Sequence, residues 1–145
     1  MICVDASVAA KWVLLEDRSD KAVALYRANA QTGQPVVAPP LLLCEVTNIL
    51  RQRMIRSSLA LADADRLLGD FLTIQIDFLL PPGQHQQALA LADAHGLPAA
   101  YDAHYLALAQ RLGCDLWTDD QRLLHAVGGV LAFVCWIGDF TPIAG

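Results

Sequence analysis

Four acidic residues spread along this 145-residue chain are its best candidates for chemistry: Asp5, Glu45, Asp102 and Asp120. Asp5 follows the apolar run ICV, and Asp120 lies just past LWT; such runs are typical of short buried strands. Glu45 and Asp102 fall on helical faces that otherwise carry mostly apolar residues. A carboxylate at the edge of a core is costly unless it is paired or bound to a metal ion. The pattern favours one shared site.

Carboxylates that converge in a fold repel one another. Two of them about 4 Å apart would repel by about 4 kcal/mol at an effective dielectric constant of 20. Protonation or a cation must relieve this repulsion. Oxygen ligands without Cys or His neighbours suit a hard cation such as Mg²⁺, for which Mn²⁺ can substitute.

Each acid also has a purely structural interpretation. Asp5 and Asp120 can cap the helices that follow them, and Asp102 lies in a first helical turn, where the helix dipole favours an anion. Glu45 is harder to explain in this way, because it shares its helical face with Leu41, Asn48, Ile49 and Gln52, and a solvated face would carry more charge. The acids alone therefore leave both a functional and a structural interpretation open.

The elements expected around these acids alternate between strands and helices. Strands are predicted at 2–4, 36–38, 74–78, 116–118 and 131–136, and helices at 8–15, 19–30, 41–56, 61–72, 84–95, 100–112 and 121–127, with Ser7 as the cap of the first helix. This alternation indicates an α/β fold, a three-layer α/β/α sandwich with a mainly parallel central sheet. Such sheets place their chemistry at the carboxyl ends of the strands, where Asp5 and Asp120 lie.

Length and composition bound the class of protein. The chain fits a single domain over residues 1–145, and with 55% hydrophobic and 17% charged residues it has apolar surface to spare for a partner. Ten Lys and Arg against 15 Asp and Glu give a net charge of −5, which argues against strong non-specific attraction to nucleic acid. It does not exclude an enzyme whose carboxylates hold cations.

Cysteine usage and hydropathy predict a cytoplasmic protein. No apolar run is long enough to cross a membrane, and no positively charged segment precedes an apolar core as in a secretory signal. The four cysteines stand singly, without metal-ligand spacing, and are expected to be mostly buried free thiols.

Four motifs together make the chain resemble the PIN domain family, and within it the VapC ribonuclease toxins of prokaryotic toxin–antitoxin modules. They are VDASVAAKW, CEVTNIL, YDAHYLALAQ and WTDDQRLL, and they span essentially the whole chain. Each motif alone is weak, and their order and spacing carry the resemblance. The family pattern of Thr, any residue, Asp selects Asp120 and leaves Asp119 as the variable middle position.

The resemblance implies a Mg²⁺-dependent endoribonuclease in which Asp5, Asp102 and Asp120 hold metal and Glu45 acts through water. Groups that would orient carboxylates or metal-bound water are Ser7, Asn48 and Thr118, and Asp119 would either join them or face solvent. Candidates for RNA contact are Lys11, Arg51, Arg53, Arg56 and Arg122. The resemblance also implies a homodimer and a cognate antitoxin protein that covers the cleft, with the apolar segment 41–72 as the expected partner surface.

Two other classes of function remain open from the sequence. One is a non-catalytic interaction module, in which the acids only cap helices and apolar surface binds another chain. The other is an aspartate-dependent phosphohydrolase, which would need a second Asp two residues after Asp5, where Ser7 stands instead. A nucleotide-binding module is a poorer alternative than either, because neither glycine-rich phosphate motif occurs.

Overall fold

A parallel five-stranded sheet forms the centre of the protein in a computed structural model that describes residues 1–143. The strands are β1 (Ile2–Val4), β2 (Val36–Ala38), β3 (Asp77–Phe78), β4 (Asp115–Thr118) and β5 (Val134–Trp136). Their order is β3-β2-β1-β4-β5, and every neighbouring pair is parallel. The predicted parallel sheet is confirmed.

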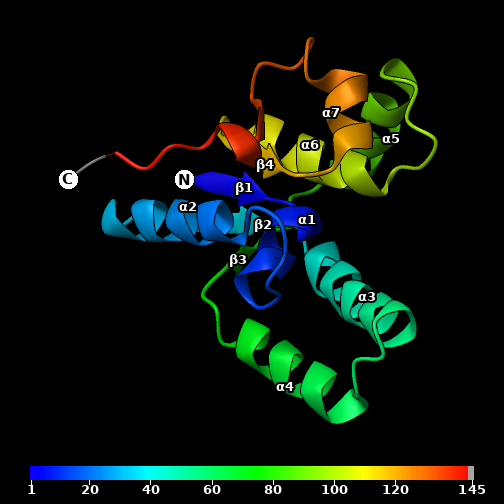
Figure 1. Cartoon of the computed structure of the whole chain (residues 1–145). Helices are drawn as coiled ribbons and strands as arrows, with labels where there is room; N and C mark the ends of the chain where they lie inside the picture. Colours follow the sequence, from blue (N-terminus) through cyan, green and yellow to red (C-terminus); the bar gives the residue numbers. More distant parts are fainter. Residues whose placement is uncertain (144–145) are drawn as a thin grey trace.

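Helices cover both faces of this sheet, as Figure 1 shows in a view across it. The helices are α1 (Ala6–Ala9), α2 (Ser19–Gln31), α3 (Leu41–Arg56), α4 (Leu61–Leu72), α5 (Gln84–Ala94), α6 (Tyr101–Leu112) and α7 (Gln121–Val127). In Figure 1, α2, α3 and α4 lie below the sheet, whereas α5, α6 and α7 lie above it. The predicted three-layer α/β/α sandwich is therefore confirmed.

The strand order changes direction between β1 and β4. From β1 the chain moves outward to β2 and β3, and it then returns to β4 on the other side of β1. In parallel sheets, the crevice at the carboxyl ends of two such strands is the usual place for a ligand. Val4 pairs in register with Trp117, so the residues that follow the two strands emerge side by side.

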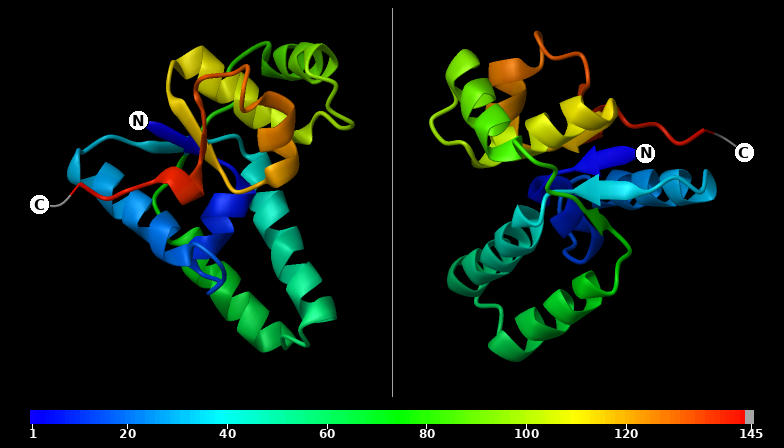
Figure 2. Two further views of the ribbon diagram at one scale, coloured as in Figure 1. Left: turned by 45° about the horizontal axis from the view of Figure 1, so that its top comes forward. Right: turned by 180° about the vertical axis from the view of Figure 1, so that it is seen from behind.

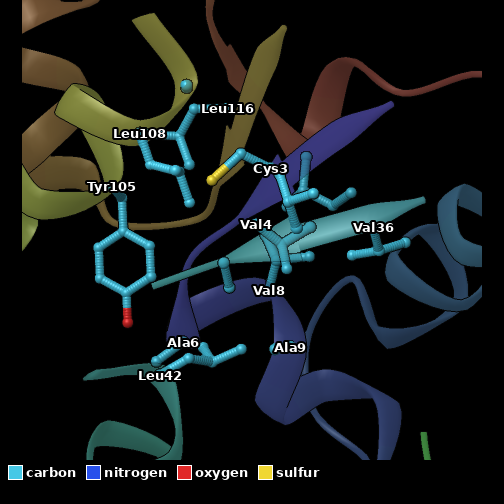
Figure 3. Close-up of a cluster of buried hydrophobic side chains, with 14 of the residues drawn as sticks. Cys3, Val4, Ala6, Val8, Ala9, Val36, Leu42, Tyr105, Leu108 and Leu116 are labelled. Atoms are coloured by element: carbon cyan, nitrogen blue, oxygen red, sulfur yellow. The ribbon is translucent and has the colours of Figure 1, made fainter. Parts of the chain in front are cut away.

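The main core lies between β1, β4 and the helices on both faces. Figure 3 shows Val4, Val8, Tyr105, Leu108 and Leu116 within it, all fully buried. These large side chains, from elements far apart in sequence, hold the sheet between its two helical layers by apolar burial.

A hairpin of α3 and α4 projects away from the sheet, as both views in Figure 2 show. A second apolar cluster, centred on Ala10, Leu14 and Leu50, anchors its base. No helix within residues 1–143 has the length and apolar character needed to cross a membrane.

Three predicted elements differ from the structure by more than one residue at an end. The first helix begins at Ala6 with Asp5 as its cap, instead of beginning after Ser7, and it continues only as a 3-10 turn that ends at Trp12. The strand expected at 74–78 is reduced to Asp77–Phe78, and that expected at 131–136 to Val134–Trp136. Both are edge strands with a single partner, so side-chain alternation extends further than backbone pairing.

The cysteines are free, as expected, but they are not uniformly buried. Cys3 and Cys114 are buried and Cys135 is half-buried, whereas Cys44 is exposed on α3. Burial thus holds for Cys3 and Cys114 and in part for Cys135, and Cys44 is the exception.

Small side chains set the packing of α5 on α6, which gives a test of the fold. Ala88 and Ala107 are fully buried at this contact. Ala107→Leu should lower the free energy of unfolding by about 1–3 kcal/mol, because the larger side chain forces two close-packed helices apart. Urea titration measures the change. Ala90→Leu, on the exposed face of α5, should stay within about 0.5 kcal/mol, and equal losses would contradict the close packing.

Candidate active site

The four acids expected to act together line one pocket of about 420 Å³ at the carboxyl ends of β1 and β4. Asp5 follows β1, Asp120 follows β4, Glu45 comes from α3 and Asp102 from α6. Ser7 and Asn48 line the same pocket. The sheet and both helical layers thus contribute to it.

Asp5 is both a helix cap and a wall of this pocket. Its side chain is only 4% exposed, and its Oδ1 accepts hydrogen bonds from the Ser7 hydroxyl at 2.6 Å and the Val8 amide at 3.3 Å. Its Oδ2 accepts a hydrogen bond from the Thr118 hydroxyl. Burial raises the pKa of Asp5 to about 7, although these hydrogen bonds favour the ionised form.

Two hydroxyl groups join the ends of β1 and β4. The Asp119 amide donates to Ser7 Oγ at 2.7 Å, and the Asp120 amide donates to Thr118 Oγ1 at 3.0 Å. Both hydroxyls donate in turn to Asp5. Ser7 and Thr118 therefore orient a carboxylate, as the sequence suggested, and they also fix the backbone before Asp120.

Asp102 and Glu45 face the pocket from opposite helical layers. Burial, together with the charges of Asp120 and Glu45, raises the pKa of Asp102 to about 6. Glu45 Oε1 accepts a hydrogen bond from the Tyr105 hydroxyl. Burial, together with the Glu45 charge, raises the pKa of Tyr105, so this hydroxyl remains a donor at all ordinary pH values.

Asp120 also has a structural role. Its Oδ1 accepts from the amides of Arg122 at 2.9 Å and Leu123 at 3.3 Å, and so caps α7. The capping interpretation is correct for Asp5 and Asp120, but both caps line the pocket as well. Capping and a role in the pocket are thus compatible.

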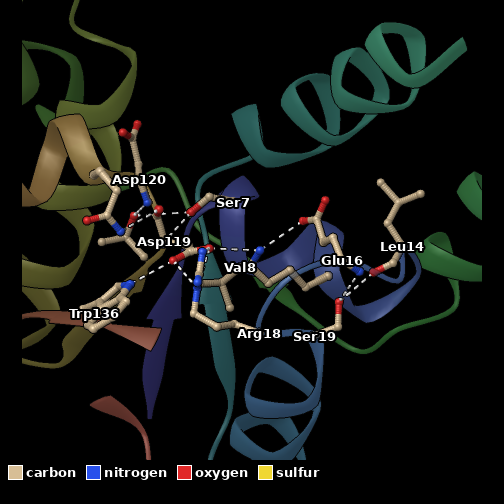
Figure 4. Close-up of polar contacts among 12 residues, drawn as sticks. Ser7, Val8, Leu14, Glu16, Arg18, Ser19, Asp119, Asp120 and Trp136 are labelled. Atoms are coloured by element: carbon tan, nitrogen blue, oxygen red, sulfur yellow. Dashed lines mark hydrogen bonds and ion pairs between the residues drawn. The ribbon is translucent and has the colours of Figure 1, made fainter. Parts of the chain in front are cut away.

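Asp119 does not face solvent, so that part of its prediction is wrong. Its side chain is 7% exposed and accepts from Arg18 Nε at 2.9 Å and from Trp136 Nε1 at 2.8 Å. Figure 4 shows that the carboxylates of Asp119 and Asp120 point to different sides. Burial alone would raise the pKa of Asp119, but bonds from Arg18, Trp136 and Lys11 outweigh it and lower that pKa.

Lys11 is not available to RNA, which corrects its prediction as a contact residue. The side chain is 6% exposed, and its Nζ lies 3.0 Å from Asp119 Oδ2 and 3.1 Å from Glu16 Oε1. Glu16 also accepts a hydrogen bond from Arg53, so the Arg53 guanidinium is only partly available for contact with RNA. We call these residues the ion cluster: Lys11, Glu16, Arg18, Arg53 and Asp119.

Sequence reasoning missed Arg18 and Trp136 as supports of the site. Arg18 adopts a left-handed backbone conformation, with φ of 65°, just before α2, and its guanidinium lies 5.8 Å from the centre of the Trp136 ring. Neither residue belongs to a motif of the acids. The remaining predicted contact residues, Arg51, Arg56 and Arg122, are exposed.

The donor set suits a hard divalent cation. Within residues 1–143, no group of three or more His, Cys, Asp and Glu side chains is arranged so that it could hold a metal ion as it stands. Magnesium commonly takes only one or two carboxylates directly and keeps several waters. Such a partly hydrated ion fits the four carboxylates around this pocket. It would relieve the repulsion by which Asp120 and Glu45 destabilise the ionised form of Asp102.

A family model for the PIN domain matches residues 2–129 of the chain. The chain belongs to the PIN domain family. The resemblance inferred from the four motifs is thus confirmed.

Curated relatives of this PIN domain include VapC ribonuclease Mb0985 of Mycobacterium bovis and ribonuclease VapC9 of Mycobacterium tuberculosis. Each is 30% identical over 123 residues, which cover 85% of this chain and 88% of the relative.

Solved structures share the fold at lower identity. PAE2754 from Pyrobaculum aerophilum aligns with a TM-score of 0.67 and 23% identity, over 94% of this chain and 90% of that one. VapC20 of Mycobacterium tuberculosis, described as a toxin that cleaves the sarcin–ricin loop, aligns with a TM-score of 0.65 and 19% identity, over 88% of this chain and 95% of that one.

Removing the Asp119 carboxylate should destabilise the PIN domain strongly. Asp119→Ala leaves buried Lys11 and half-buried Arg18 without their shared anion, so the free energy of unfolding should fall by about 3 kcal/mol. Asp63→Ala breaks the exposed pair with Arg66 and should cost about 0.5 kcal/mol or less. Chemical denaturation compares the two variants, and similar losses would show that the ion cluster is not a buried support.

The raised pKa of Asp5 predicts a pH-dependent stability in chelator. A carboxyl with a higher pKa when folded binds its proton more tightly there, so this stabilisation is complete below about pH 4 and is lost as pH rises through about 7. The loss is about 4 kcal/mol at most, and Asp102 adds to it up to about pH 6. Asp5→Asn should flatten the profile of unfolding free energy against pH; an unchanged slope would refute the assignment.

Proposed function

We propose that this PIN domain is a VapC-type ribonuclease that hydrolyses RNA phosphodiester bonds with the help of a divalent metal ion. The observation that carries the proposal is the meeting of four acids, from widely separated positions, in one pocket at the β1–β4 crevice. The ribonuclease names of the curated relatives and the family match support it. Divalent-metal dependence is general among PIN-domain nucleases.

Asp5, Asp102 and Asp120 are the residues proposed to hold the metal, with Glu45 acting through water. The ion proposed is Mg²⁺, for which Mn²⁺ substitutes, because all four donors are carboxylates. A bound divalent cation lowers the pKa of its water and neutralises charge on the phosphoryl oxygens. The acids concentrate negative charge where that ion would be needed.

Other residues of the chain keep these acids in position. The Ser7 and Thr118 hydroxyls each donate to one oxygen of Asp5 and so fix the orientation of its carboxylate. Tyr105 does the same for Glu45 across the pocket. Asn48 lines the wall beside Glu45 and is proposed to orient bound water or substrate.

Contacts to the RNA backbone are proposed for exposed arginines. Arg122 follows Asp120 on α7 and borders an open hollow that also includes His125. Arg51 and Arg56 are exposed on α3, the helix that carries Glu45. Arg53 is a weaker candidate because its guanidinium already binds Glu16.

Protein partners are proposed on the α3–α4 hairpin. An apolar groove of about 340 Å³ lies between these helices, lined in part by Leu50, Met54, Leu61 and Leu68, and Leu61 is 70% exposed. This surface fits the expected homodimer and the cognate antitoxin. The cytoplasmic location inferred from the sequence remains a prediction.

The two competing functions are less well supported. In an aspartate-dependent phosphohydrolase an acid would stand two residues after Asp5, but Ser7 is there and is engaged with Asp5 and Asp119. A non-catalytic module accounts for the caps on α1 and α7. It accounts for Asp102 only through the helix dipole at the start of α6. It does not account for Glu45, which caps no helix and lines the same pocket.

Loss of one pocket acid should abolish RNA cleavage without unfolding the protein. Asp102→Asn should reduce cleavage of RNA in Mg²⁺ at least about 100-fold, because metal-assisted catalysis supplies several kcal/mol. Chelator should do the same to the unaltered protein, and Asp63→Asn on exposed α4 is the control. Gel analysis of labelled RNA gives the rates. Cleavage that persists in chelator would refute the proposed function.

A further inference from the structure

Tyr101 presents an aromatic ring to solvent at the edge of the acid pocket. It is the first residue of α6, its side chain is 63% exposed, and it lines the pocket together with Asp102. The next tyrosine on α6, Tyr105, lies one turn further along the helix, is fully buried and donates to Glu45. Tyr101 thus has no part in the apolar core that would explain its ring.

The pocket wall offers little Coulombic attraction to an RNA backbone. Its described lining includes four carboxylates and no Lys or Arg, and the whole chain carries a net charge of −5. Phosphates are therefore repelled here except where a cation intervenes. A nucleobase is uncharged, and every base has a π-face that stacks on an aromatic ring at about 1–3 kcal/mol per base.

The rest of the lining is suited to a base. Leu41 and Ile49, both half-buried on α3, add apolar surface to the pocket, and Asn48 adds an amide that can hydrogen-bond a base edge. Apolar and amide groups thus accompany the acids, and Tyr101 is the only aromatic residue of the described lining.

We propose that Tyr101 stacks on the base of a nucleotide adjacent to the scissile phosphate, and so selects unpaired RNA. Tyr101 and Asp102 are neighbours at the start of α6, and both line the pocket that holds the four acids. A base on the Tyr101 ring thus places its neighbouring phosphate near the acids. A paired base is already stacked and cannot offer its face. This inference rests on the proposed ribonuclease function.

Binding of RNA to a cleavage-deficient protein tests the stack. In an Asp120→Asn background, fluorescence anisotropy measures the Kd for a labelled 12-nucleotide single-stranded RNA pool of random sequence, in Mg²⁺. Tyr101→Ala should weaken binding about tenfold, equivalent to about 1.4 kcal/mol. Tyr101→Phe and Tyr101→Trp should bind within about threefold of Tyr101, since each keeps a ring.

A salt titration separates stacking from a phosphate contact. Losing a phosphate contact reduces the slope of log Kd against log salt by about one, whereas losing a stack leaves the slope unchanged. An RNA in which every base is absent should bind the Tyr101 and Tyr101→Ala proteins equally. Phe78→Ala, which removes an exposed ring at the edge strand β3, is the matched control and should leave Kd unchanged.

The outcomes distinguish this inference from the function on which it rests. Equal Kd for the Tyr101 and Tyr101→Ala proteins would overturn the stack, as would loss of binding in Tyr101→Phe, which would assign the contact to the hydroxyl. Both results are compatible with a ribonuclease. Failure of the unaltered protein to cleave any RNA in Mg²⁺ or Mn²⁺ would overturn the proposed function itself.

Discussion

Burial of the Asp5 carboxylate is the constraint on which the rest of the site depends. A charged group that is 4% exposed requires hydrogen-bond donors on both of its oxygens, and two of the three come from side chains. Those donors, Ser7 and Thr118, belong to elements separated by more than a hundred residues. Satisfying one acid therefore joins the end of β1 to the end of β4 and fixes the loop that carries Asp120.

The ion cluster stabilises the junction of β1 and β4 through Asp119, the residue before Asp120. Asp119 accepts from Lys11, Arg18 and Trp136, so the loop after β4 is bound to the segment before α2 and to β5. Exposed ion pairs contribute little to stability, but removing one member of a buried cluster leaves uncompensated charge. The cluster therefore holds the loop after β4 so that the Asp119 side chain supports the fold and the Asp120 side chain lines the pocket.

Much of the fold and the four acids of the pocket could be predicted from local sequence. Helices at 41–56, 61–72 and 121–127 match α3, α4 and α7 at both ends, and for α7 the boundaries carry a capping Asp120 and a terminal Gly128. The inward position of Glu45 followed from its apolar helical neighbours. The lengths of the two edge strands were overestimated, because the alternation of apolar and polar residues shows which side chains face the core but not how far a partner strand extends.

The ion cluster could not be predicted in the same way. Arg18 and Asp119 are 101 positions apart, and a lysine one turn into a helix ordinarily reaches solvent. Only the tertiary structure brings Glu16 and Asp119 to Lys11. The sequence therefore suggested that Lys11 contacts RNA, whereas in the fold its charge is neutralised by these two carboxylates.

The order in which the sheet is built has a consequence for synthesis. β4 and β5 complete one side of the sheet, and Asp120 and Trp136 belong to this last part of the described chain. A nascent polypeptide on the ribosome acquires its first three strands, with Asp5 and Glu45, before Thr118 of β4, which donates to the second oxygen of Asp5, has been made. The set of four acids is complete only after translation has passed Asp120, so a shorter chain lacks one wall of the pocket.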